Sequence, residues 1–366
     1  MNFKPFKMAQ FSAQWPLGKL HNMHSSNPEP WTWDELSEAI ETDLYSILNN
    51  TSFAYEPVQG NQTVREQISQ LYHSGLSVAD ITLTSGAQEG IFLVMQALLN
   101  PGDHVITFSP CFEPLTQVAI DAGAQVSTLP LDEINGWTIN WDLLENSFNE
   151  STKLVVINFP HNPTGAHISE AELLQLIKLC EQHNCWLFSD EVFRGLEHLT
   201  ADRISCAADL YDKAITMGVL SKALALPGVR LGWLSCQNND LNRQILTIKS
   251  HLSICQSSLD AQLCQAIIPH SELMWQRSVG IINRNKANLA ELLASNQAFK
   301  WHAPKASATA FIQCHDSEAT DLCQLWGTHH RLLLLPNEVF LTRHSGFRLT
   351  LGSQRIQPKY KQLFKA

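Results

Sequence analysis

Between residues 81 and 235, short apolar runs alternate with helical stretches, and this alternation limits the possible folds more than any other feature of the chain. The clearest helical stretch begins after Ser169, where Glu172 stands three residues on and predicts a capping box. The alternation predicts an α/β fold, in which a mostly parallel sheet is covered by helices on both faces. In such sheets, ligands bind at the carboxyl ends of the strands. The apolar runs, expected to be strands, are Val105–Phe108, Val126–Leu129, Leu154–Phe159, Trp186–Phe188, Ala214–Gly218 and Leu231–Ser235.

The two ends of the chain show different patterns. A long helical pattern runs from about Glu272 to Ser295, and the segments after it predict a smaller α+β domain. Residues 1–30 carry four prolines and are expected to form an irregular arm, followed by a helix from about Trp31. We therefore predict three parts: an N-terminal arm packed with the small domain, a large domain and a small C-terminal domain. Their expected bounds are 1–40, 41–265 and 266–366. Within the small domain the expected elements are strands at Ala308–Cys314 and Phe347–Leu351 and a helix near Asp321–Thr328.

The composition is that of a globular protein, with 44% hydrophobic and 16% charged residues. A net charge of −10 argues against a general nucleic-acid binder, which needs a basic face. The 9 cysteines form no CxxC pair and read as small buried hydrophobes in a reducing compartment. The 15 histidines are dispersed, so no metal site is expected. Without an apolar run long enough for a signal sequence or a membrane span, the protein is expected to be soluble and cytoplasmic.

Two segments could hold a small anion or fix a side chain beside it. Ser85, Gly86 and Ala87 stand just before a helix, where backbone N–H groups and the helix dipole favour an anion. The same residues also suit an ordinary helix opening. In the segment HNPTG, two prolines and a glycine fix a turn that could orient the Asn162 amide, and the Asn162–Pro163 bond could be cis. A plain loop between strand and helix is the alternative.

Two further segments place charged side chains among apolar residues. Asp190, in SDEVF, follows an apolar strand and could pair with a protonated ring nitrogen, although a salt bridge or helix cap is equally open. Lys222 and Arg230 lie in the almost wholly apolar segment SKALALPGVRLGW. A lysine in apolar surroundings has a lowered pKa and becomes a nucleophile for an aldehyde, whereas most lysines are simply solvated.

The order Asn162, Asp190, Lys222, Arg230 is more specific than any one of these residues. With HNPTG, SDEVF and SKALALPGVRLGW, the chain resembles the class I/II aminotransferases, the fold-type I pyridoxal-phosphate enzymes of the aspartate aminotransferase superfamily. The resemblance runs from about Tyr55 to Gly352. It implies a large domain with a mostly parallel seven-stranded sheet, and pyridoxal 5'-phosphate as the cofactor.

The resemblance implies a role for each residue around the cofactor ring. Lys222 would hold the cofactor as a Schiff base and then move a proton between the substrate Cα and C4' of the cofactor. Asp190 would pair with the pyridine nitrogen and keep it protonated. Asn162 would donate a hydrogen bond to the 3'-oxygen. Phe112, in SPCF, would stack on the ring, unless it is only a core phenylalanine.

The resemblance also implies how the cofactor phosphate is bound. Arg230 would bind it bidentately, and the backbone of Gly86, Ala87 and Gln88 would complete the cradle. Tyr55, in YEPVQG, resembles the tyrosine that reaches the phosphate of the neighbouring subunit. A homodimer with shared active sites is therefore expected.

On the substrate side, Arg348 in FRLTLG resembles the arginine that binds the α-carboxylate, and Asn162 would assist it. An arginine inside an apolar strand suggests a buried anionic partner, with a plain salt bridge as the alternative. Two positions depart from the commonest pattern of the family. Phe193 stands where a tyrosine usually donates to the 3'-oxygen, and Val219 where Ser or Thr often touches the phosphate. These departures put ordinary aspartate-type transamination in doubt.

Transamination between an α-amino acid and a 2-oxo acid is the expected activity. The alternative is a pyridoxal-phosphate lyase or cyclase on the same scaffold, acting by β-elimination or replacement or in the manner of capreomycidine synthase-like enzymes. A non-enzymatic cofactor-binding regulator is disfavoured, because residues 1–50 offer no helix-turn-helix and no basic cluster. A nicotinamide-binding enzyme is disfavoured by the lack of a GxGxxG after a first strand.

Overall fold

A seven-stranded sheet forms the centre of the large domain in a computed structural model that describes residues 4–16, 18–72, 74–315 and 317–364. The strand order is β2-β8-β7-β6-β5-β3-β4, and β8 runs antiparallel to both of its neighbours while the other pairs are parallel. The prediction of an α/β fold with a mostly parallel sheet is confirmed. The strands are β2 Ile81–Thr84, β3 His104–Ser109, β4 Gln125–Pro130, β5 Thr152–Asn158, β6 Trp186–Asp190, β7 Ala214–Val219 and β8 Gly232–Ser235.

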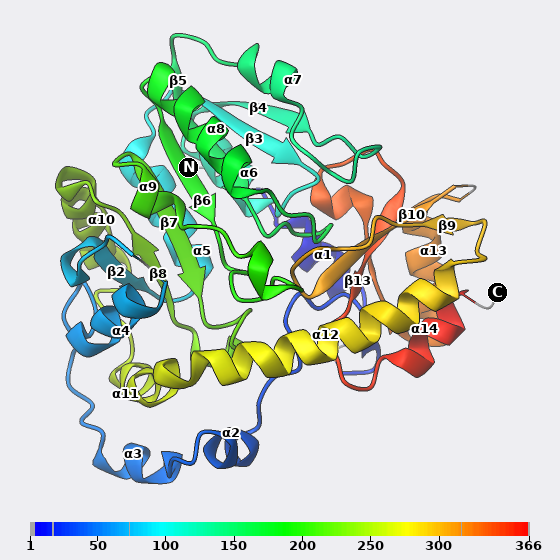
Figure 1. Ribbon diagram of the computed structural model, residues 1–366, viewed down its shortest axis with the longest axis horizontal. Coiled ribbons are helices and arrows are strands. Elements are labelled where there is room, and N and C mark those ends of the chain that lie inside the picture. Colours follow the sequence, from blue (N-terminus) through cyan, green and yellow to red (C-terminus); the bar gives the residue numbers. More distant parts are fainter. Residues whose placement is uncertain (1–3, 17, 73, 316, 365–366) are drawn as a thin grey trace.

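Helices cover both faces of this sheet. Figure 1 shows α8 and α9 in front of the strands and α5 behind them. The predicted capping box is present at the start of α8, where the Ser169 side chain accepts from the Glu172 N–H and the Glu172 carboxylate accepts from the Ser169 N–H. The helices along this part of the chain are α3 Leu44–Asn50, α4 Gln62–Tyr72, α5 Ala87–Leu98, α6 Pro114–Asp121, α7 Trp141–Glu145, α8 Glu170–Gln182, α9 Ala207–Leu210, α10 Asn239–Leu252 and α11 Ser258–Ile267.

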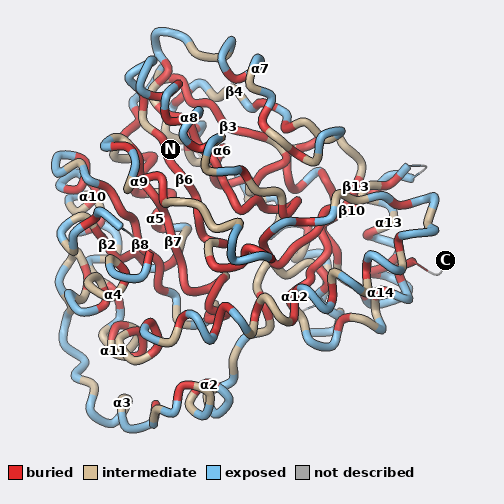
Figure 2. The backbone as a smooth tube through the Cα atoms, viewed as in Figure 1, coloured by how far each residue is buried: buried red, intermediate tan, exposed pale blue. Residues whose placement is uncertain are grey.

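The central strands are buried along their whole length. Every residue of β2, β7 and β8 is buried, and Figure 2 shows the sheet as a continuous buried layer beneath exposed helices and loops. Burial on both faces explains why these strands appear in the sequence as unbroken apolar runs instead of alternating patterns. The residues that end β5, β6 and β7 are themselves buried, so polar side chains there must find partners.

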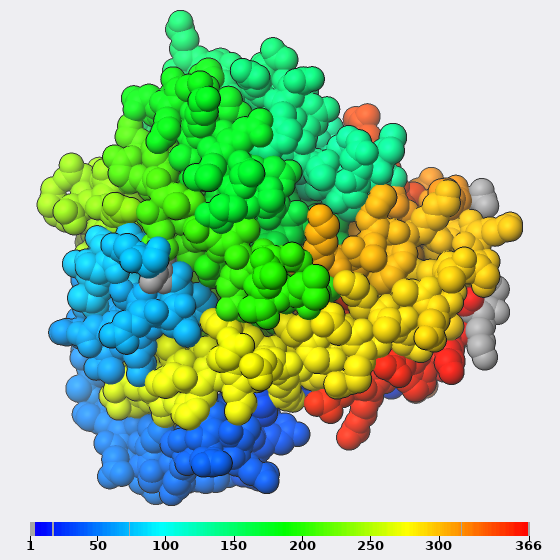
Figure 3. Space-filling model, in the orientation of Figure 1, coloured from blue at the N-terminus to red at the C-terminus, as the bar shows by residue number. Residues whose placement is uncertain are grey.

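A second, four-stranded antiparallel sheet lies in the C-terminal part, with the order β12-β13-β10-β9. Its strands are β9 Phe299–Lys300, β10 Thr309–Cys314, β12 Leu335–Pro336 and β13 Gly346–Thr350. The long helix α12, Ser271–Leu293, crosses the face of the molecule shown in Figure 3 and links the two parts. The helix expected near Asp321–Thr328 is α13, Ala319–Leu325, and continues into a π-helical turn over Trp326–His330. The last helix is α14, Gln357–Phe364.

The N-terminal segment is more regular than its prolines suggested. It contains helix α1, Lys7–Ala13, and strand β1, His21–Asn22, so the expectation of an irregular arm was wrong there. β1 pairs in parallel with β11, Leu332–Leu333. The prolines at 5 and 16 flank α1, where they do not interrupt its hydrogen bonds. The helix expected near Trp31 is α2, Trp33–Ala39, capped by Thr32.

Two general properties follow from the described residues. All nine cysteines carry free thiols, and eight of them are buried. Across the described ranges, we find no helix that combines the length and the apolar character needed to cross a bilayer.

Candidate active site

A cavity of about 320 Å³ opens at the carboxyl ends of the central strands, where parallel α/β sheets bind ligands. Its size falls in the range of small-molecule sites. Eight residues predicted for the site line it together, although they come from segments spread over 262 positions between Ala87 and Arg348. They are Ala87, Gln88, Phe112, Asn162, Asp190, Lys222, Arg230 and Arg348.

The Lys222 amine lies inside this cavity and is held by the N-terminal arm. It donates hydrogen bonds to Ser26 Oγ at 2.8 Å and to Asn27 Oδ1 at 2.7 Å. Burial lowers the pKa of the amine to about 7, and the positive charge of Arg348 acts in the same direction. About half of the Lys222 amines are therefore neutral at pH 7, which is the nucleophilic form.

The Asp190 carboxyl ends β6 and faces the same cavity. Burial raises its pKa to about 7, although the Val192 N–H donates to Oδ1 at 3.2 Å and Lys222 lies nearby. The backbone around it is fixed by Asn158, whose side chain donates to the Asp190 carbonyl at 3.0 Å and accepts from the Asn162 N–H at 3.0 Å. Asn158 thus joins the end of β5 to the end of β6 and to the HNPTG loop.

His161 fixes the other side of the HNPTG loop. Its Nε2 donates to the Pro110 carbonyl at 2.9 Å, so Nδ1 accepts from Thr164 Oγ1 at 2.7 Å. Burial lowers the pKa of His161 to about 4, and the ring is neutral at pH 7. The Asn162–Pro163 peptide bond is cis. The loop that presents Asn162 is therefore tied to the segment that carries Phe112.

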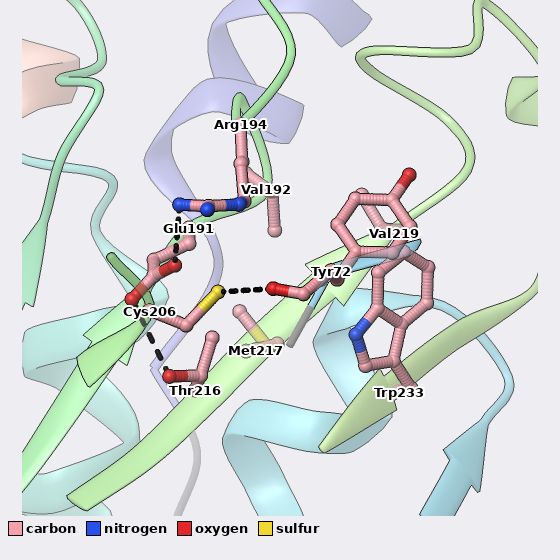
Figure 4. Close-up of a pocket in the computed structure, with 10 residues that line it drawn as sticks. Tyr72, Glu191, Val192, Arg194, Cys206, Thr216, Met217, Val219 and Trp233 are labelled. Carbon is pink, nitrogen blue, oxygen red and sulfur yellow. Dashed lines mark hydrogen bonds and ion pairs between the residues drawn. The ribbon is translucent and has the colours of Figure 1, made fainter. Parts of the chain in front are cut away.

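Glu191, the second acid of SDEVF, lies in a separate buried cluster (Figure 4). It pairs with Arg194 at 3.7 Å and accepts a hydrogen bond from Thr216 Oγ1 at 3.3 Å. The Cys206 thiol donates to the Tyr72 carbonyl at 3.1 Å beside it. The cavity here is only about 10 Å³, on the scale of one water molecule. The sequence left open whether the acidic pair is a ligand or a salt bridge, and the structure gives the salt bridge to Glu191 and the cavity-facing position to Asp190.

Arg230 closes the end of the cavity next to the N-terminus of α5. It adopts a left-handed backbone conformation with φ 56° and is exposed. A Cβ on Gly86 would lie 2.5 Å from Arg230 Nη2, and Gly86 itself has φ +82°. Only glycine satisfies both conditions, since a side chain would collide with the guanidinium and strain the backbone. Gly86 does not itself line the cavity, but it sets the approach of Arg230 to the helix N-terminus.

Behind this turn lies a buried charge pair that the sequence did not reveal. The Glu89 carboxylate accepts from the Ser85 N–H and from Ser253 Oγ. The fully buried Lys249 amine lies 3.6 Å from Glu89 Oε1 and donates to Ser253 Oγ at 2.8 Å. Lys249 supplies the counter-charge that makes a carboxylate tolerable at this buried position.

Arg348 lies on β13 and reaches into the cavity from the opposite side. Its side chain donates from Nη1 to Asn162 Oδ1 at 2.8 Å and from Nε to the His24 carbonyl at 2.9 Å. It is 2% exposed, and burial lowers its pKa to about 9. No acidic group is among these partners, so the guanidinium is held in place by neutral acceptors.

Tyr55 does not line the cavity of its own chain. It is 86% exposed, as is Phe53 two residues before it.

Sequence reasoning also missed several lining residues. Phe6, Met8, Ser26 and Asn27 belong to the N-terminal arm, which carries no motif for them. Trp31 and Trp33 border a second cavity of about 370 Å³.

A half-buried lysine of lowered pKa, a buried acid and a buried arginine around one cavity are typical of an enzyme active site. A family model for the class I and II aminotransferases matches residues 25–362, and the chain belongs to this family of pyridoxal-phosphate-dependent enzymes. The chain is similar to known proteins of that family. It is 29% identical to capreomycidine synthase of Streptomyces vinaceus over 324 residues, which are 87% of this chain and 82% of that protein.

Other relatives are transaminases. A probable kynurenine–oxoglutarate transaminase of Saccharomyces cerevisiae is 33% identical over 252 residues, covering 64% of this chain and 54% of the relative. The crystal structure of a pyridoxal-phosphate-dependent aminotransferase from Streptococcus suis superposes with a TM-score of 0.92 at 26% identity, over 99% of this chain and 97% of the other. The prediction of family, fold and cofactor is confirmed.

Proposed function

We propose that the protein transfers an amino group between an α-amino acid and a 2-oxo acid, with Lys222 as the catalytic amine. The observation that carries this proposal is the Lys222 amine, half-buried with a pKa of about 7, in one cavity with Asp190 and Arg348. Pyridoxal phosphate, when bound, supplies an aldehyde and an electron sink for the carbanion at Cα.

The residues around Lys222 suit the two tasks of that amine. Its neutral form at pH 7 is the form that would hold the cofactor aldehyde, and the same amine would carry a proton to and from the substrate Cα. Asp190 would pair with the protonated ring nitrogen, because a nearby positive charge stabilises the anionic form of a buried carboxyl. Phe112 would stack on the ring, and Asn162 would donate to its 3'-oxygen.

The phosphate would bind at the N-terminus of α5. The backbone of Ala87 and Gln88 lies in the first turn of the 12-residue helix α5, where an anion is favoured. Gly86 is the N-cap of this helix, and its own N–H donates to the Thr84 carbonyl at 2.8 Å. Arg230 would add a bidentate contact beside Gly86. The Glu89 carboxylate, paired with Lys249, accepts the hydrogen bond of the Ser85 N–H and so stabilises the conformation of this turn.

Arg348 would bind the substrate α-carboxylate, assisted by Asn162. A buried guanidinium whose partners are a carbonyl and an amide oxygen is incompletely neutralised, and an anionic ligand would complete it. With its carboxylate held by Arg348, the substrate would have its Cα in the cavity that Lys222 also lines.

A lyase or cyclase is the second candidate, and one observation favours it. The relative that covers 87% of this chain is a capreomycidine synthase, and the fold is shared with the pyridoxal-phosphate-dependent cyclase OrfR at a TM-score of 0.90 and 21% identity. The centre of the Phe193 ring lies 5.7 Å from the Lys222 amine, and a phenylalanine has no hydroxyl that could donate to the 3'-oxygen of the cofactor. The chemistry after Cα deprotonation therefore decides between the two candidates.

An absorption spectrum of the purified holoenzyme, recorded with single amino acids and no oxo acid, separates these functions. A shift from the visible band to the near-ultraviolet pyridoxamine band in one turnover supports transamination and names the donor. A band that returns unchanged while ammonia, an oxo acid or a cyclised product appears supports the lyase or cyclase. Turnover that survives in Lys222→Ala would refute the assignment of the catalytic amine.

We also propose a homodimer in which Tyr55 reaches the phosphate site of the neighbouring subunit. The exposed Tyr55 and the exposed end of the cavity at Arg230 support it. Mixing inactive Lys222→Ala subunits with Tyr55→Ala subunits tests it. A hybrid then has one site with both residues intact and should regain activity, whereas Tyr55 acting within its own chain would give no recovery.

We retain, as a proposal, the division into an arm at 1–40, a large domain at 41–265 and a small domain at 266–366. The arm joins the small domain by its backbone. β1 pairs with β11, and the Thr350 N–H donates to the Met23 carbonyl at 2.7 Å. Limited proteolysis would test the division by the position of the first cuts.

A further inference from the structure

The Glu191 carboxylate is anchored by three elements that surround the end of β6. Its Oε1 accepts hydrogen bonds from Ser189 Oγ on β6 at 2.9 Å and from the Ala207 N–H at the start of α9 at 3.0 Å. Thr216 Oγ1 on β7 donates to the same oxygen at 3.3 Å, and Arg194 supplies a positive charge 3.7 Å from Oε2. Figure 4 shows the Glu191 side chain between Arg194 and Thr216. Because Glu191 is 6% exposed, these contacts fix a carboxylate that water cannot solvate.

This anchor lies one peptide bond from Asp190. Neighbouring side chains of a strand point to opposite faces, and at the end of β6 Asp190 lines the large cavity whereas Glu191 lines the small one. The Glu191 N–H donates to the Met217 carbonyl at 3.0 Å, and Asn158 holds the Asp190 carbonyl. The Asp190 carboxyl accepts from the Val192 N–H, only two residues on. Its direction therefore depends on how this stretch of the chain is held.

We infer that Glu191 is a positioning residue, which keeps the Asp190 carboxyl directed at the place of the cofactor ring nitrogen. This inference rests on the proposed pairing of Asp190 with that nitrogen. A hydrogen bond weakens steeply when its angle is disturbed, so a small rotation of the chain at the end of β6 would weaken the pairing. A carboxylate suits the anchoring role, because hydrogen bonds to an ionised acceptor are about twice as strong as those to a neutral one. Glu191 does not itself line the cavity and acts through Asp190.

Two cofactors that differ in one ring atom test the inference by binding and not by activity. The cofactor-free protein is titrated with pyridoxal 5'-phosphate and with 1-deazapyridoxal 5'-phosphate, in which a C–H group replaces the ring nitrogen. The ratio of the two affinities isolates the contact to Asp190, and Asp190→Ala should abolish the preference for the natural cofactor. Glu191→Ala should reduce this preference about tenfold and change the binding of the analogue no more than about twofold.

Two results would overturn the inference in different ways. Equal losses for both cofactors in Glu191→Ala would assign Glu191 to general packing and leave the role of Asp190 intact. Equal binding of both cofactors by the unaltered protein would instead overturn the proposed role of Asp190, which would remove the basis of the inference as well.

Conservative and matched variants complete the test. Glu191→Gln keeps the acceptor oxygen and should restore most of the preference. Ser189→Ala removes one donor without changing a charge and should lower the preference about threefold, which keeps the inference testable if Glu191→Ala does not fold. Glu197→Ala is the matched control, because Glu197 is 3% exposed and pairs with Arg203 at 3.1 Å, away from Asp190. An unchanged preference in Ser189→Ala, or a loss of preference in Glu197→Ala as large as in Glu191→Ala, would contradict the inference.

Discussion

The pKa of Lys222 makes a quantitative prediction about the cofactor-free enzyme. Burial lowers that pKa from 10.5 to about 7. At pH 7 about half of the Lys222 amines are then neutral, against about 1 in 3,000 for an ordinary aliphatic amine. The proportion of reactive amine is higher by about a thousandfold. Lys222 should therefore react as a nucleophile at a pH where other lysines are almost wholly protonated.

Trace labelling with acetic anhydride measures this directly. The cofactor-free protein is labelled between pH 5.5 and 10 together with a free aliphatic amine as a reference, and acetylation of Lys222 is quantified by mass spectrometry. Labelling should rise through pH 6–8 and level off above pH 8, while the reference continues to rise. Arg348→Gln should move the curve to higher pH, because the Arg348 charge lowers the Lys222 pKa. Arg343→Gln, at an exposed position, is the control.

A labelling curve for Lys222 that parallels the free amine up to pH 10 would refute the reasoning.

The same lowered pKa of Lys222 also affects the stability of the folded chain. Because the folded chain binds the Lys222 proton less tightly than the unfolded chain, its free energy of unfolding falls as the pH drops from about 10 to about 7. Lys222→Met should thus stabilise the cofactor-free protein by roughly 2–4 kcal/mol at pH 6 and hardly at all at pH 10.5, as measured by urea unfolding.

Two further predictions concern the turn at the start of α5. Lys249→Met should lower the free energy of unfolding by about 3–5 kcal/mol, because it leaves the buried Glu89 carboxylate without a counter-charge, and adding Glu89→Gln should restore much of the loss in urea unfolding. A double variant no more stable than the single one would show that packing, not charge, matters there. Gly86→Ala should weaken cofactor binding at least tenfold in a fluorescence titration, because the new Cβ would lie 2.5 Å from Arg230 Nη2. Gly228→Ala, which has open space, should bind the cofactor normally, and equal affinity in both variants would contradict the argument.

Much of the large domain is encoded locally and was predictable. The apolar runs that became β3, β5, β6 and β7 are buried on both faces, so each appears in the sequence as a strand without knowledge of its neighbours. The capping box of Ser169 and Glu172 likewise involves residues three apart. The N-terminal arm was predicted less well, because prolines at its ends masked the short helix α1 between them.

The site residues divide in the same way. Asn162, Asp190 and Lys222 stand in short motifs whose residue types and order could be read directly from the sequence. Residues that follow parallel strands are brought together, because the carboxyl ends of these strands lie at one edge of the sheet. Phe6 and Met8 follow no motif, since their place in the cavity depends on how the arm folds back over the large domain.

The sequence by itself determined the α/β class, the order of the motif residues and hence the family and its cofactor. Only the tertiary structure decided that Glu191 pairs with Arg194, outside the cavity that Asp190 lines, and that Lys249 neutralises Glu89 across 160 positions of chain. The reason is physical. Local propensity and hydrophobic pattern act between near neighbours, whereas burial, pKa and charge pairing depend on groups that only the folded chain brings within a few ångströms.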